Sequence, residues 1–482
     1  MISFVMEGHD MAYEVQTAIQ IFFPNKHYYP VDNIPDSGMA VKSVFKNGKS
    51  EAAFFENGVG VCSNSIEVPQ NFSEREKKRF IKEPIYNMLS EYTGYVPKWG
   101  MITGVRPAKT AGELLEAGMN DEDIIKYFTE GYKTSYQKAA LALNVYKAER
   151  KILDLNGPND ISLYIGIPFC PTRCLYCSFT SYPIDIYAKK ADEYIEKLAI
   201  EMKFVSEAVK GRNIRSLYIG GGTPTSLSDE QFAVFMEHVA ENFDVKNVGE
   251  FTVEAGRPPT ITPAKLKAMK DSFVSRISIN PQTMNQKTLD IIGRRHSVDD
   301  IRRAFFMARE NGFENINMDI ILGLPDEKTS DVENTMIQLE KLSPESITVH
   351  TLAVKRASRL KETINDYGLT AAEEMERMIE ISSNYAEKIE LKPYYMYRQK
   401  AMLGNFENVG YAKDGFESVY NVEIMEERQS VIAMGAGGAT KLYNPMKNEI
   451  SRVFNVKSVD DYLARIDEMI ERKRAAFIDK KF

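Results

Sequence analysis

The sequence predicts an α/β protein whose central part is a parallel sheet. From Ser162 onward, short apolar stretches alternate with amphipathic, charged stretches of helical spacing. Six strands separated by helices favour parallel strands joined by right-handed crossovers. This alternation fits a barrel and an open doubly wound sheet equally well. At 482 residues the chain is too long for one ordinary core, which indicates two or three domains.

The region before this alternation has a different pattern. AVKSVF and EAAFF are strand-like and are separated by the turn signal NGKS. Two helix-like charged segments follow, SEREKKRFIKEPIYNMLSEY and SYQKAALALNVYKAERKILDL. The tract NGPND (156–160) combines Gly, Pro and Asn, which is typical of a domain boundary. We therefore predict an N-terminal α+β accessory domain over 1–155.

The remaining chain divides at about residue 365. We expect the six strands at SLYIGI, SLYIGGG, EFTVEA, SRISIN, NINMDIIL and SITVHTLA, and helices at AKKADEYIEKLAIEMKFVSEAV and SVDDIRRAFFMARENG. These elements predict a core domain over 156–365. The tail over 366–482 begins with the Glu-rich helical segment TAAEEMERMIEISSNYAEKI and contains the glycine-rich passage MGAGGAT. We expect a mostly helical extension that closes the active site.

Composition and charge argue against several classes of protein. The chain is 43% hydrophobic and 27% charged, as in soluble globular proteins. It has no run of 18 apolar residues, so we expect no membrane span. The formal charge of -7 gives no general attraction to nucleic acid. The N-terminal MISFVMEGHDMAYE lacks the basic-then-apolar layout of a signal peptide, so we expect a cytoplasmic protein.

Three of the four cysteines lie within eight residues, directly after the first strand of the alternation. YIGIPFCPTRCLYCSF contains the spacing C-x3-C-x2-C, formed by Cys170, Cys174 and Cys177. Iron–sulfur clusters are held by thiolates, and three thiolates hold three corners of a cubane. Because no fourth cysteine is close by, one iron would stay open to an external ligand. Cys62 stands apart, and we expect it to be a small, partly buried thiol.

Zinc and a purely structural group of cysteines are the alternatives to a cluster. Structural zinc usually takes four protein ligands, often from two C-x2-C pairs. The sequence has no second pair, and its five histidines are scattered. The spacing therefore favours the cluster.

Polar residues and glycines follow the later strands. GGGTPT (220–225) ends the second strand, where glycines let backbone groups approach a ligand closely, although a structural turn is the alternative. Glu254, Gln282 and Asp319 lie at or near the ends of three further strands. A charge inside an apolar strand is costly unless it is paired or bound to a ligand, so Asp319 is either a ligand contact or a carboxylate bonded to the backbone. Arg294, in GRRH, is a further candidate, with a solvated basic turn as its alternative.

The cysteine motif after the first strand resembles the radical S-adenosylmethionine (SAM) superfamily. The resemblance implies a [4Fe–4S] cluster on Cys170, Cys174 and Cys177, whose open iron binds the amino and carboxylate groups of SAM. It also implies reductive cleavage of SAM to methionine and a 5′-deoxyadenosyl radical. The implied fold is a partial (β/α)6 barrel with the site at the C-terminal ends of the strands.

The ordered motifs YIGIPFC, LYC, GGGTPT, VEA, SINPQ, GRRHS, NMDIILGLP and ITVHTLA are together similar to the oxygen-independent coproporphyrinogen III oxidase (dehydrogenase) family. The resemblance implies that Tyr164, Gly221 and Glu254 contact the first SAM. It places further residues on nucleotide-binding positions, some of which serve a second SAM, and these are Gly220, Gly222, Thr223, Gln282, Arg294 and Asp319. Tyr176 takes the place of an aromatic residue between two cluster cysteines. Ala439 falls where the tail returns to the SAM site.

The sequence departs from the family pattern at two positions, since Gly166 replaces the usual His and Phe179 replaces a fourth nearby Cys of the oxidase. A sister branch, a haem chaperone, has an H-N-x-x-Y-W motif, where this chain has YNVEIM (420–425). The missing His removes the expected axial haem ligand, which disfavours a chaperone. WGMITGVRP (99–107) and YRQKAMLGNFENVGYA (397–412) resemble the HemZ branch of the family.

The resemblance implies an activity, the oxidative decarboxylation of coproporphyrinogen III propionates to the vinyl groups of protoporphyrinogen IX. Lys355, Arg356 and Arg359 are candidates to bind the tetrapyrrole carboxylates, with a solvated basic loop as the alternative. An external electron donor such as a flavodoxin is implied. The other hypotheses are a haem-binding trafficking protein and a radical SAM enzyme with another substrate. The role of the N-terminal domain stays open among substrate gating, partner docking and structural support.

Overall fold

The computed structural model describes residues 1–482 except 25, 105, 180, 356, 364–366, 368–369, 399–405 and 480–482. The candidate residue Arg356 lies outside the described residues, as do parts of 99–107 and 397–412. Two compact units make up the chain. The first contains Met1–Lys147 with Met396–Glu407, and the second contains Ala148–Tyr395 with Asn408–Phe482.

The first unit is built on a five-stranded sheet in the order β2-β1-β3-β4-β5. The central strand β1 is parallel to β2 and β3, and β3, β4 and β5 are antiparallel to one another. A core of apolar side chains from β1, α1, β3, β4 and α2 joins the sheet to its two helices. Its elements are β1 (Ile2–Glu7), α1 (Ala12–Phe22), β2 (Tyr28–Pro30), β3 (Met39–Lys46), β4 (Lys49–Glu56), β5 (Val59–Glu67), α2 (Glu74–Thr93), α3 (Pro107–Glu116) and α4 (Asp121–Tyr132), and α5 (Tyr136–Leu153) runs on into the second unit.

Local sequence explains two of these elements. The turn signal between β3 and β4 is a two-residue hairpin in which Asn47 and Gly48 both have positive φ, which suits the twist of the paired strands. Helix α2 begins with a capping box between Ser73 and Glu76, as its first residues SERE favour. Cys62 is half-buried in β5, as expected.

The second unit contains an eleven-stranded sheet, and all six strands expected from the sequence are present in it. They are neighbours in the order β6-β9-β10-β11-β12-β13 and are parallel throughout. Strands β14 and β18 end this sheet, so it stays open, which confirms a partial barrel. The six strands are β6 (Asp160–Ile167), β9 (Asn213–Gly221), β10 (Glu250–Glu254), β11 (Arg276–Ser278), β12 (Ile316–Leu322) and β13 (Ser346–Thr351).

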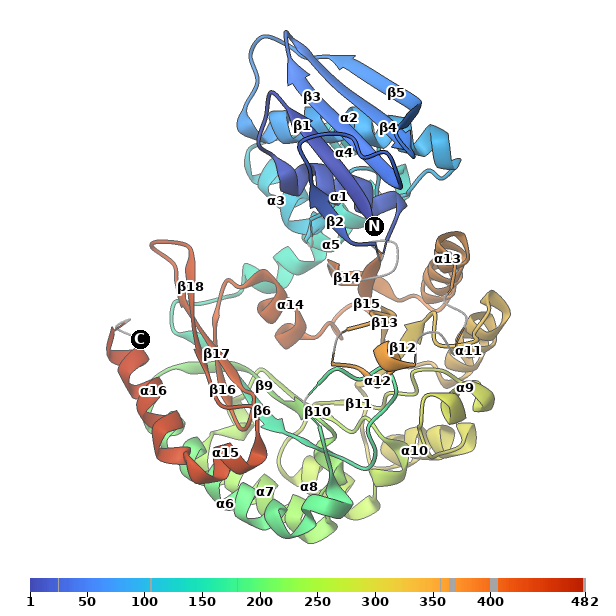
Figure 1. Ribbon diagram of the computed structural model, residues 1–482. Coiled ribbons are helices and arrows are strands. Elements are labelled where there is room, and N and C mark those ends of the chain that lie inside the picture. The colour runs from blue at the N-terminus through green and yellow to red at the C-terminus, as the bar shows by residue number, and fades with distance from the viewer. Residues whose placement is uncertain are drawn as a thin grey trace. The chain divides into compact units, whose positions relative to one another are not determined.

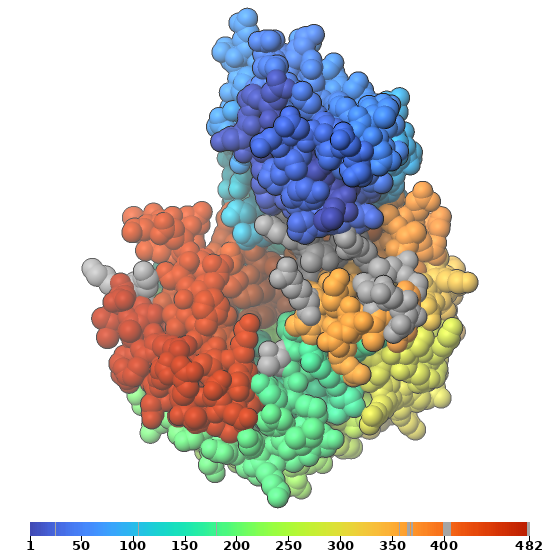
Figure 2. Space-filling model, viewed as in Figure 1, coloured from blue at the N-terminus to red at the C-terminus, as the bar shows by residue number. Residues whose placement is uncertain are grey.

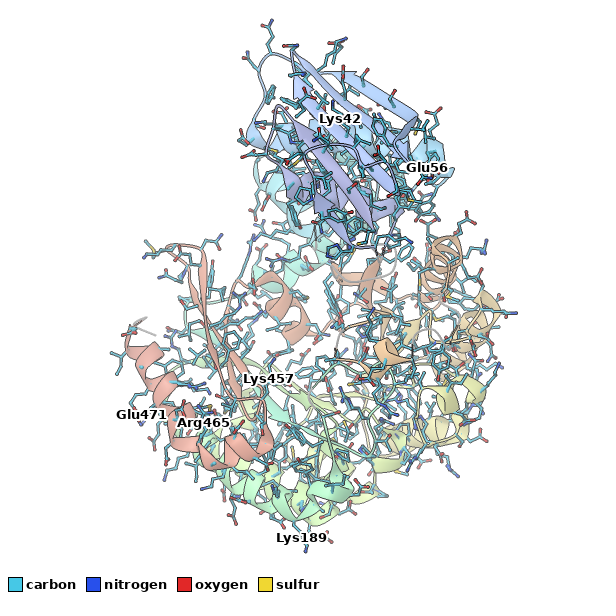
Figure 3. The ribbon with its side chains drawn as sticks, in the orientation of Figure 1. Lys42, Glu56, Lys189, Lys457, Arg465 and Glu471 are labelled. Carbon is cyan, nitrogen blue, oxygen red and sulfur yellow. The ribbon has the colours of Figure 1, made fainter. Side chains whose placement is uncertain are left out.

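Helices cover the outer side of the curved strands, while α14 (Val419–Glu426) lies on the inner side (Figure 1). Charged side chains labelled on this outer layer, Lys189 and Glu471, point away from the sheet (Figure 3). No helix among the described residues is long and apolar enough to cross a membrane. The other helices of the core are α6 (Ile184–Ala208), α7 (Asp229–Asn242), α8 (Pro263–Asp271), α9 (Gln286–Ile291), α10 (Val298–Glu310), α11 (Thr329–Leu342) and α12 (Arg359–Glu362), with short 3-10 helices η1 (Pro224–Ser226), η2 (Val245–Asn247) and η3 (Pro258–Thr260).

The tail contains helices, as expected, and also five strands that the sequence analysis did not anticipate. Strands β14 and β15 continue the sheet beyond β13, and β16, β17 and β18 continue it beyond β6. β16 is an entirely buried run of five residues, and such a run carries no period that separates strand from helix. The elements are α13 (Ala372–Lys388), β14 (Lys392–Arg398), β15 (Glu407–Ala412), β16 (Ser430–Met434), β17 (Ala439–Asn444), β18 (Glu449–Phe454), α15 (Val459–Ala464) and α16 (Ile466–Asp479).

Candidate active site

The three clustered cysteines lie on a loop at the C-terminal end of β6. Pro168 follows β6, and the two-residue strand β7 (Phe169–Cys170) pairs with β8 (Tyr182–Pro183), which closes the loop at its base. The backbone of Leu175, inside the loop, donates to Ile292 O at 3.0 Å and accepts from Leu360 N at 2.9 Å. The loop is therefore held by the turn after α9 and by α12. In Figure 2 the blue-green segment that carries the loop reaches the surface beside the orange segment of α12.

Burial and mutual repulsion both act on the thiols. Burial raises the pKa of Cys170 to about 11, and the neighbouring Cys174 and Cys177 add to this effect. The pKa of Cys177 is raised chiefly by burial and also by Cys174. The side chain of Thr223 bonds to Cys170 Sγ at 3.5 Å. With these raised pKa values the thiols of Cys170 and Cys177 are protonated at neutral pH, so cluster binding would release their protons.

The glycine turn after β9 packs directly against this loop. Gly222 N donates to Ile167 O at 2.8 Å, and Thr223 N donates to Phe169 O at 2.7 Å. Gly221 has a φ of +110°, which a side chain would disfavour. A Cβ on Gly222 would lie 2.5 Å from Phe169 O. Gly221 and Gly222 therefore allow the close approach of two backbone segments, while a Cβ on Gly220 would lie 2.8 Å from the Tyr218 ring and 3.0 Å from the Glu254 carboxyl group.

Glu254 lies at the end of β10, next to a stack of tyrosine rings. Tyr218 donates to Glu254 Oε1 at 2.6 Å. Burial raises the pKa of Glu254 to about 7, although this hydrogen bond opposes the shift. The ring of Tyr218 stacks on Tyr420 of α14 with centroids 4.4 Å apart, and Tyr164 stacks on both rings at 6.3 Å and 6.1 Å. Tyr164 and Glu254, two of the predicted SAM contacts, thus lie in one group of half-buried side chains against the buried Tyr420.

Gln282 and Asp319 meet on neighbouring segments. Gln282 N donates to Asp319 O at 2.9 Å, and Gln282 has a φ of +68°. Its Oε1 is buried and accepts no hydrogen bond within the described residues. For Asp319, burial raises the pKa, but His350 and the hydrogen bond from Asn317 lower it more, so the net pKa falls below its usual value. Asp319 is thus a half-buried anion with side-chain partners, Asn317 donating at 2.7 Å.

Arg294 is 4% exposed, so its alternative as a solvated basic turn is wrong. Its guanidinium donates to Pro281 O at 2.9 Å and Gly256 O at 2.9 Å, and also to Asn280 O. Tyr176 lies close by, and its pKa is raised well above the usual value by burial and by Cys174. Arg294 therefore joins the loop after β10 to the loop after β11, beside the cysteine loop.

Ala439 is placed further from this group. It begins β17, which is separated from β6 by β16. The preceding glycine passage is the part of the tail that reaches the site, since a Cβ on Gly435 would lie 2.4 Å from Gly166 O. A buried network fixes this passage. Tyr194 donates to Gly166 O at 2.7 Å and accepts from Ala436 N at 2.9 Å, and Glu201 accepts from Gly435 N at 2.8 Å.

Two side chains at the site were missed by sequence reasoning. Tyr218 bonds to Glu254, and Arg257 donates to Cys174 Sγ at 2.8 Å. Tyr218 lies within the apolar stretch SLYIGGG, so nothing in the sequence distinguishes it from the packing residues of that strand. The sequence did point to Arg257, because a cation just after a strand and before two prolines is unusual.

The residues present fit a cubane cluster and a nucleotide-like ligand. In the described part of the chain, no three His, Cys, Asp or Glu side chains converge on one metal ion. In a cubane each thiolate would bind a different iron atom, and the three cysteines lie on one loop that can supply three such ligands. The buried, unbonded Gln282 Oε1 and Arg294 Nε offer an acceptor and a donor to a further ligand.

Comparison with known proteins identifies the class of protein to which this site belongs. The family model described as "Radical SAM superfamily" matches residues 164–339. The solved structure of coproporphyrinogen III oxidase (HemN) from Escherichia coli aligns with a TM-score of 0.51 at 20% identity, covering 69% of this chain and 73% of that one. This likeness supports the fold. The protein is therefore a radical SAM protein, a class that uses a [4Fe–4S] cluster and SAM as cofactors.

Proteins of similar sequence show which family within the radical SAM superfamily this chain belongs to. The chain is 38% identical over 412 residues to the oxygen-independent coproporphyrinogen-III oxidase-like protein HemZ of Bacillus subtilis, covering 84% of this chain and 82% of that protein. It is 32% identical over 300 residues to the heme chaperone HemW of the same organism, covering 61% of this chain and 76% of that protein. The chain belongs to the family of HemZ-like, oxygen-independent coproporphyrinogen-III oxidase-like proteins.

Proposed function

We propose that this protein is an enzyme that oxidatively decarboxylates coproporphyrinogen III propionates to vinyl groups. The observation that carries its radical chemistry is the contact between the cysteine loop and the glycine turn, through Gly222, Thr223 and Phe169. The substrate is suggested by the name of the HemZ relative. In this proposal Cys170, Cys174 and Cys177 hold the cluster, and SAM lies between the glycine turn and Glu254.

When bound, the cluster and SAM supply a 5′-deoxyadenosyl radical that abstracts a hydrogen atom from a propionate β-carbon. The substrate radical then loses CO2 and passes one electron to an acceptor, which leaves the vinyl group. The role of the protein is to hold and shield these groups. Glu254, Gln282 and Asp319 would anchor SAM, and the stacked tyrosine rings would keep water from the radical.

The substrate carboxylates need cationic partners. Lys355 precedes α12 and Arg359 is its first residue, and this helix holds the cysteine loop through Leu360. The Lys355 ammonium lies 6.0 Å from the centre of the Phe179 ring, which follows the last cysteine by two residues. Cations in this position can meet a carboxylate near the loop. Replacing both Lys355 and Arg359 with Ala should raise the KM for coproporphyrinogen more than it lowers kcat.

A haem chaperone is the second candidate, since HemW relatives match the chain. The residue at the position of the chaperone's His is Tyr420, which is buried and stacked on Tyr218. Burial raises the pKa of Tyr420 well above its usual value, so its hydroxyl stays protonated and is a poor axial ligand. This favours the enzyme over the chaperone.

The test uses anaerobically reconstituted protein with coproporphyrinogen III, SAM, a low-potential reductant to start SAM cleavage and a one-electron acceptor for the electron that the substrate radical gives up. We expect vinyl products and 5′-deoxyadenosine, and Cys174→Ala should lose bound iron and both products. Formation of 5′-deoxyadenosine without any vinyl product would point to another substrate. Stoichiometric haem binding with no vinyl product would instead favour the chaperone.

A further inference from the structure

Arg257 is a buried cation placed on a cysteine sulfur. It is 5% exposed, and its Nη2 donates to Cys174 Sγ and to Thr172 O, each at 2.8 Å, and more weakly to Thr172 Oγ1 at 3.3 Å. Among the ion pairs of the described residues, it has no carboxylate partner. Burying an unpaired cation is costly, and a neutral thiol is a weak acceptor. The cation is therefore compensated when Cys174 is a thiolate.

The backbone that carries Arg257 is fixed. Thr260 donates to Arg257 O twice, from its backbone nitrogen at 2.9 Å and from Oγ1 at 2.7 Å. The Thr260 hydroxyl also bonds to Thr225 Oγ1 at 2.6 Å, in the turn that follows the glycines. Pro258 and Pro259 restrict the next two residues. The guanidinium therefore projects from a rigid loop between β10 and η3, and its position does not depend on the cysteine loop alone.

The charge of Arg257 reaches all three cysteines. Burial raises the pKa values of Cys170 and Cys177, and Arg257 lowers both. Other groups facing this pocket are Arg294, Arg173, Tyr176, Thr223 and His296. Burial and the two buried arginines lower the pKa of His296 to about 4, so this ring is neutral at pH 7. Among the described residues, Arg257 is thus the cation with a hydrogen bond to a cysteine sulfur.

We propose that Arg257 is a positioning residue that raises the reduction potential of the cluster through its hydrogen bond to Cys174 Sγ. This rests on the proposed function, in which Cys174 is a cluster ligand. The cluster gains one negative charge when it accepts an electron. Net charge and hydrogen bonds to the sulfurs set the potential of such clusters, so a buried cation on a ligand sulfur stabilises the reduced form. Arg257 would therefore make the cluster easier to reduce by an external donor.

The test is a redox titration of the reconstituted cluster, followed by electron paramagnetic resonance in the absence of substrate. Three variants are compared with the parent protein, Arg257→Gln, Arg257→Lys and Thr172→Val. At the potential where the parent is half reduced, Arg257→Gln should lower the ratio of reduced to oxidised cluster about tenfold, or about 59 mV for one electron. Arg257→Lys keeps the charge without the planar fork and should lower the ratio about threefold.

Thr172→Val is the matched control for loop structure. It removes the hydroxyl that accepts from Arg257 and donates to Gly293 O, but it leaves the bond to Cys174. We expect no change in potential for this variant. A shift as large as that of Arg257→Gln would overturn the proposal, because loop structure would then set the potential.

An unchanged potential in both arginine variants, with full iron content, would also overturn the proposal while the proposed function stands. If Arg257→Gln does not retain its cluster, the reduction potential measured for Arg257→Lys decides whether the proposal holds. Failure of the parent itself to bind about four irons and SAM would instead refute the proposed function.

Discussion

Replacing Tyr218 with Phe should change the pH dependence of SAM binding. The variant removes the hydroxyl that donates to Glu254 Oε1 at 2.6 Å. Burial raises the pKa of Glu254 to about 7, while the Tyr218 hydrogen bond and His350 lower it and Asp319 raises it further. Tyr164 and Tyr420 also face this carboxyl group. Below pH 7 the carboxyl is protonated, so affinity for the cationic SAM should rise as the pH increases through about 7.

The size of the change follows from the hydrogen bond. A hydrogen bond to a charged group contributes about 1.5–3 kcal/mol, and 1.36 kcal/mol corresponds to one pKa unit. Without the hydroxyl the ionised carboxylate is less stable, so the midpoint of the binding profile should move upward by about one to two pH units. At pH 7.5 the affinity should fall roughly 3- to 20-fold.

The assay is calorimetric titration of reconstituted protein with SAM between pH 6 and pH 9. Any titration of SAM itself is common to both proteins and cancels in the comparison. Tyr420→Phe serves as a control, since it removes a hydroxyl from the ring stacked on Tyr218, and its profile should match that of the parent. Superimposable profiles for Tyr218→Phe and the parent would refute the role of this hydrogen bond.

Two further predictions concern packing and charge. Gly222→Ala should weaken SAM binding and destabilise the site by about 1–3 kcal/mol, because its Cβ would lie 2.5 Å from Phe169 O. Gly131→Ala is the control, because open space surrounds the new Cβ. An equal loss of thermal stability in Gly222→Ala and Gly131→Ala would contradict this explanation. Lys473→Met should lower the unfolding free energy by about 3–5 kcal/mol, because it leaves the buried Glu201 carboxylate without the ammonium at 2.6 Å. Adding Glu201→Gln should recover part of the thermal stability, and no recovery would argue against the ion pair.

The sequence predicts the six parallel strands well because they are short apolar runs separated by long charged helices, whereas the partial barrel was implied by the family resemblance. The tail strands were missed for the opposite reason. SVIAM is buried at every position with four consecutive apolar residues, and ENVGYA contains Gly and Asn, so neither has the alternation of a half-buried strand. Both are strands because the exposed edges of the parallel sheet offer them backbone partners.

The sequence could predict which residues form the site, but it could not predict the hydrogen bonds between their side chains. The cysteine spacing and the glycine turn are local patterns, so the sequence shows them directly. The bonds from Tyr218 to Glu254 and from Arg257 to Cys174 join residues separated by 36 and 83 positions. For Arg294 the sequence left a binding residue and a solvated basic turn both open, because its partners are backbone carbonyls, which have no sequence signature.

The short segment Met396–Glu407 gives the first unit an unusual dependence on the tail. Glu407 is 1% exposed at its side chain, and it accepts from Trp99 Nε1 at 2.6 Å and pairs with Lys138. Arg398 donates to Ile102 O at 2.7 Å. A truncation after Lys147 would therefore leave the N-terminal fragment without part of its own interior, and the remaining fragment would expose a carboxylate and a guanidinium that have lost their partners. To express the N-terminal unit by itself, residues 396–407 should therefore be fused to the fragment 1–147 or supplied to it as a separate peptide.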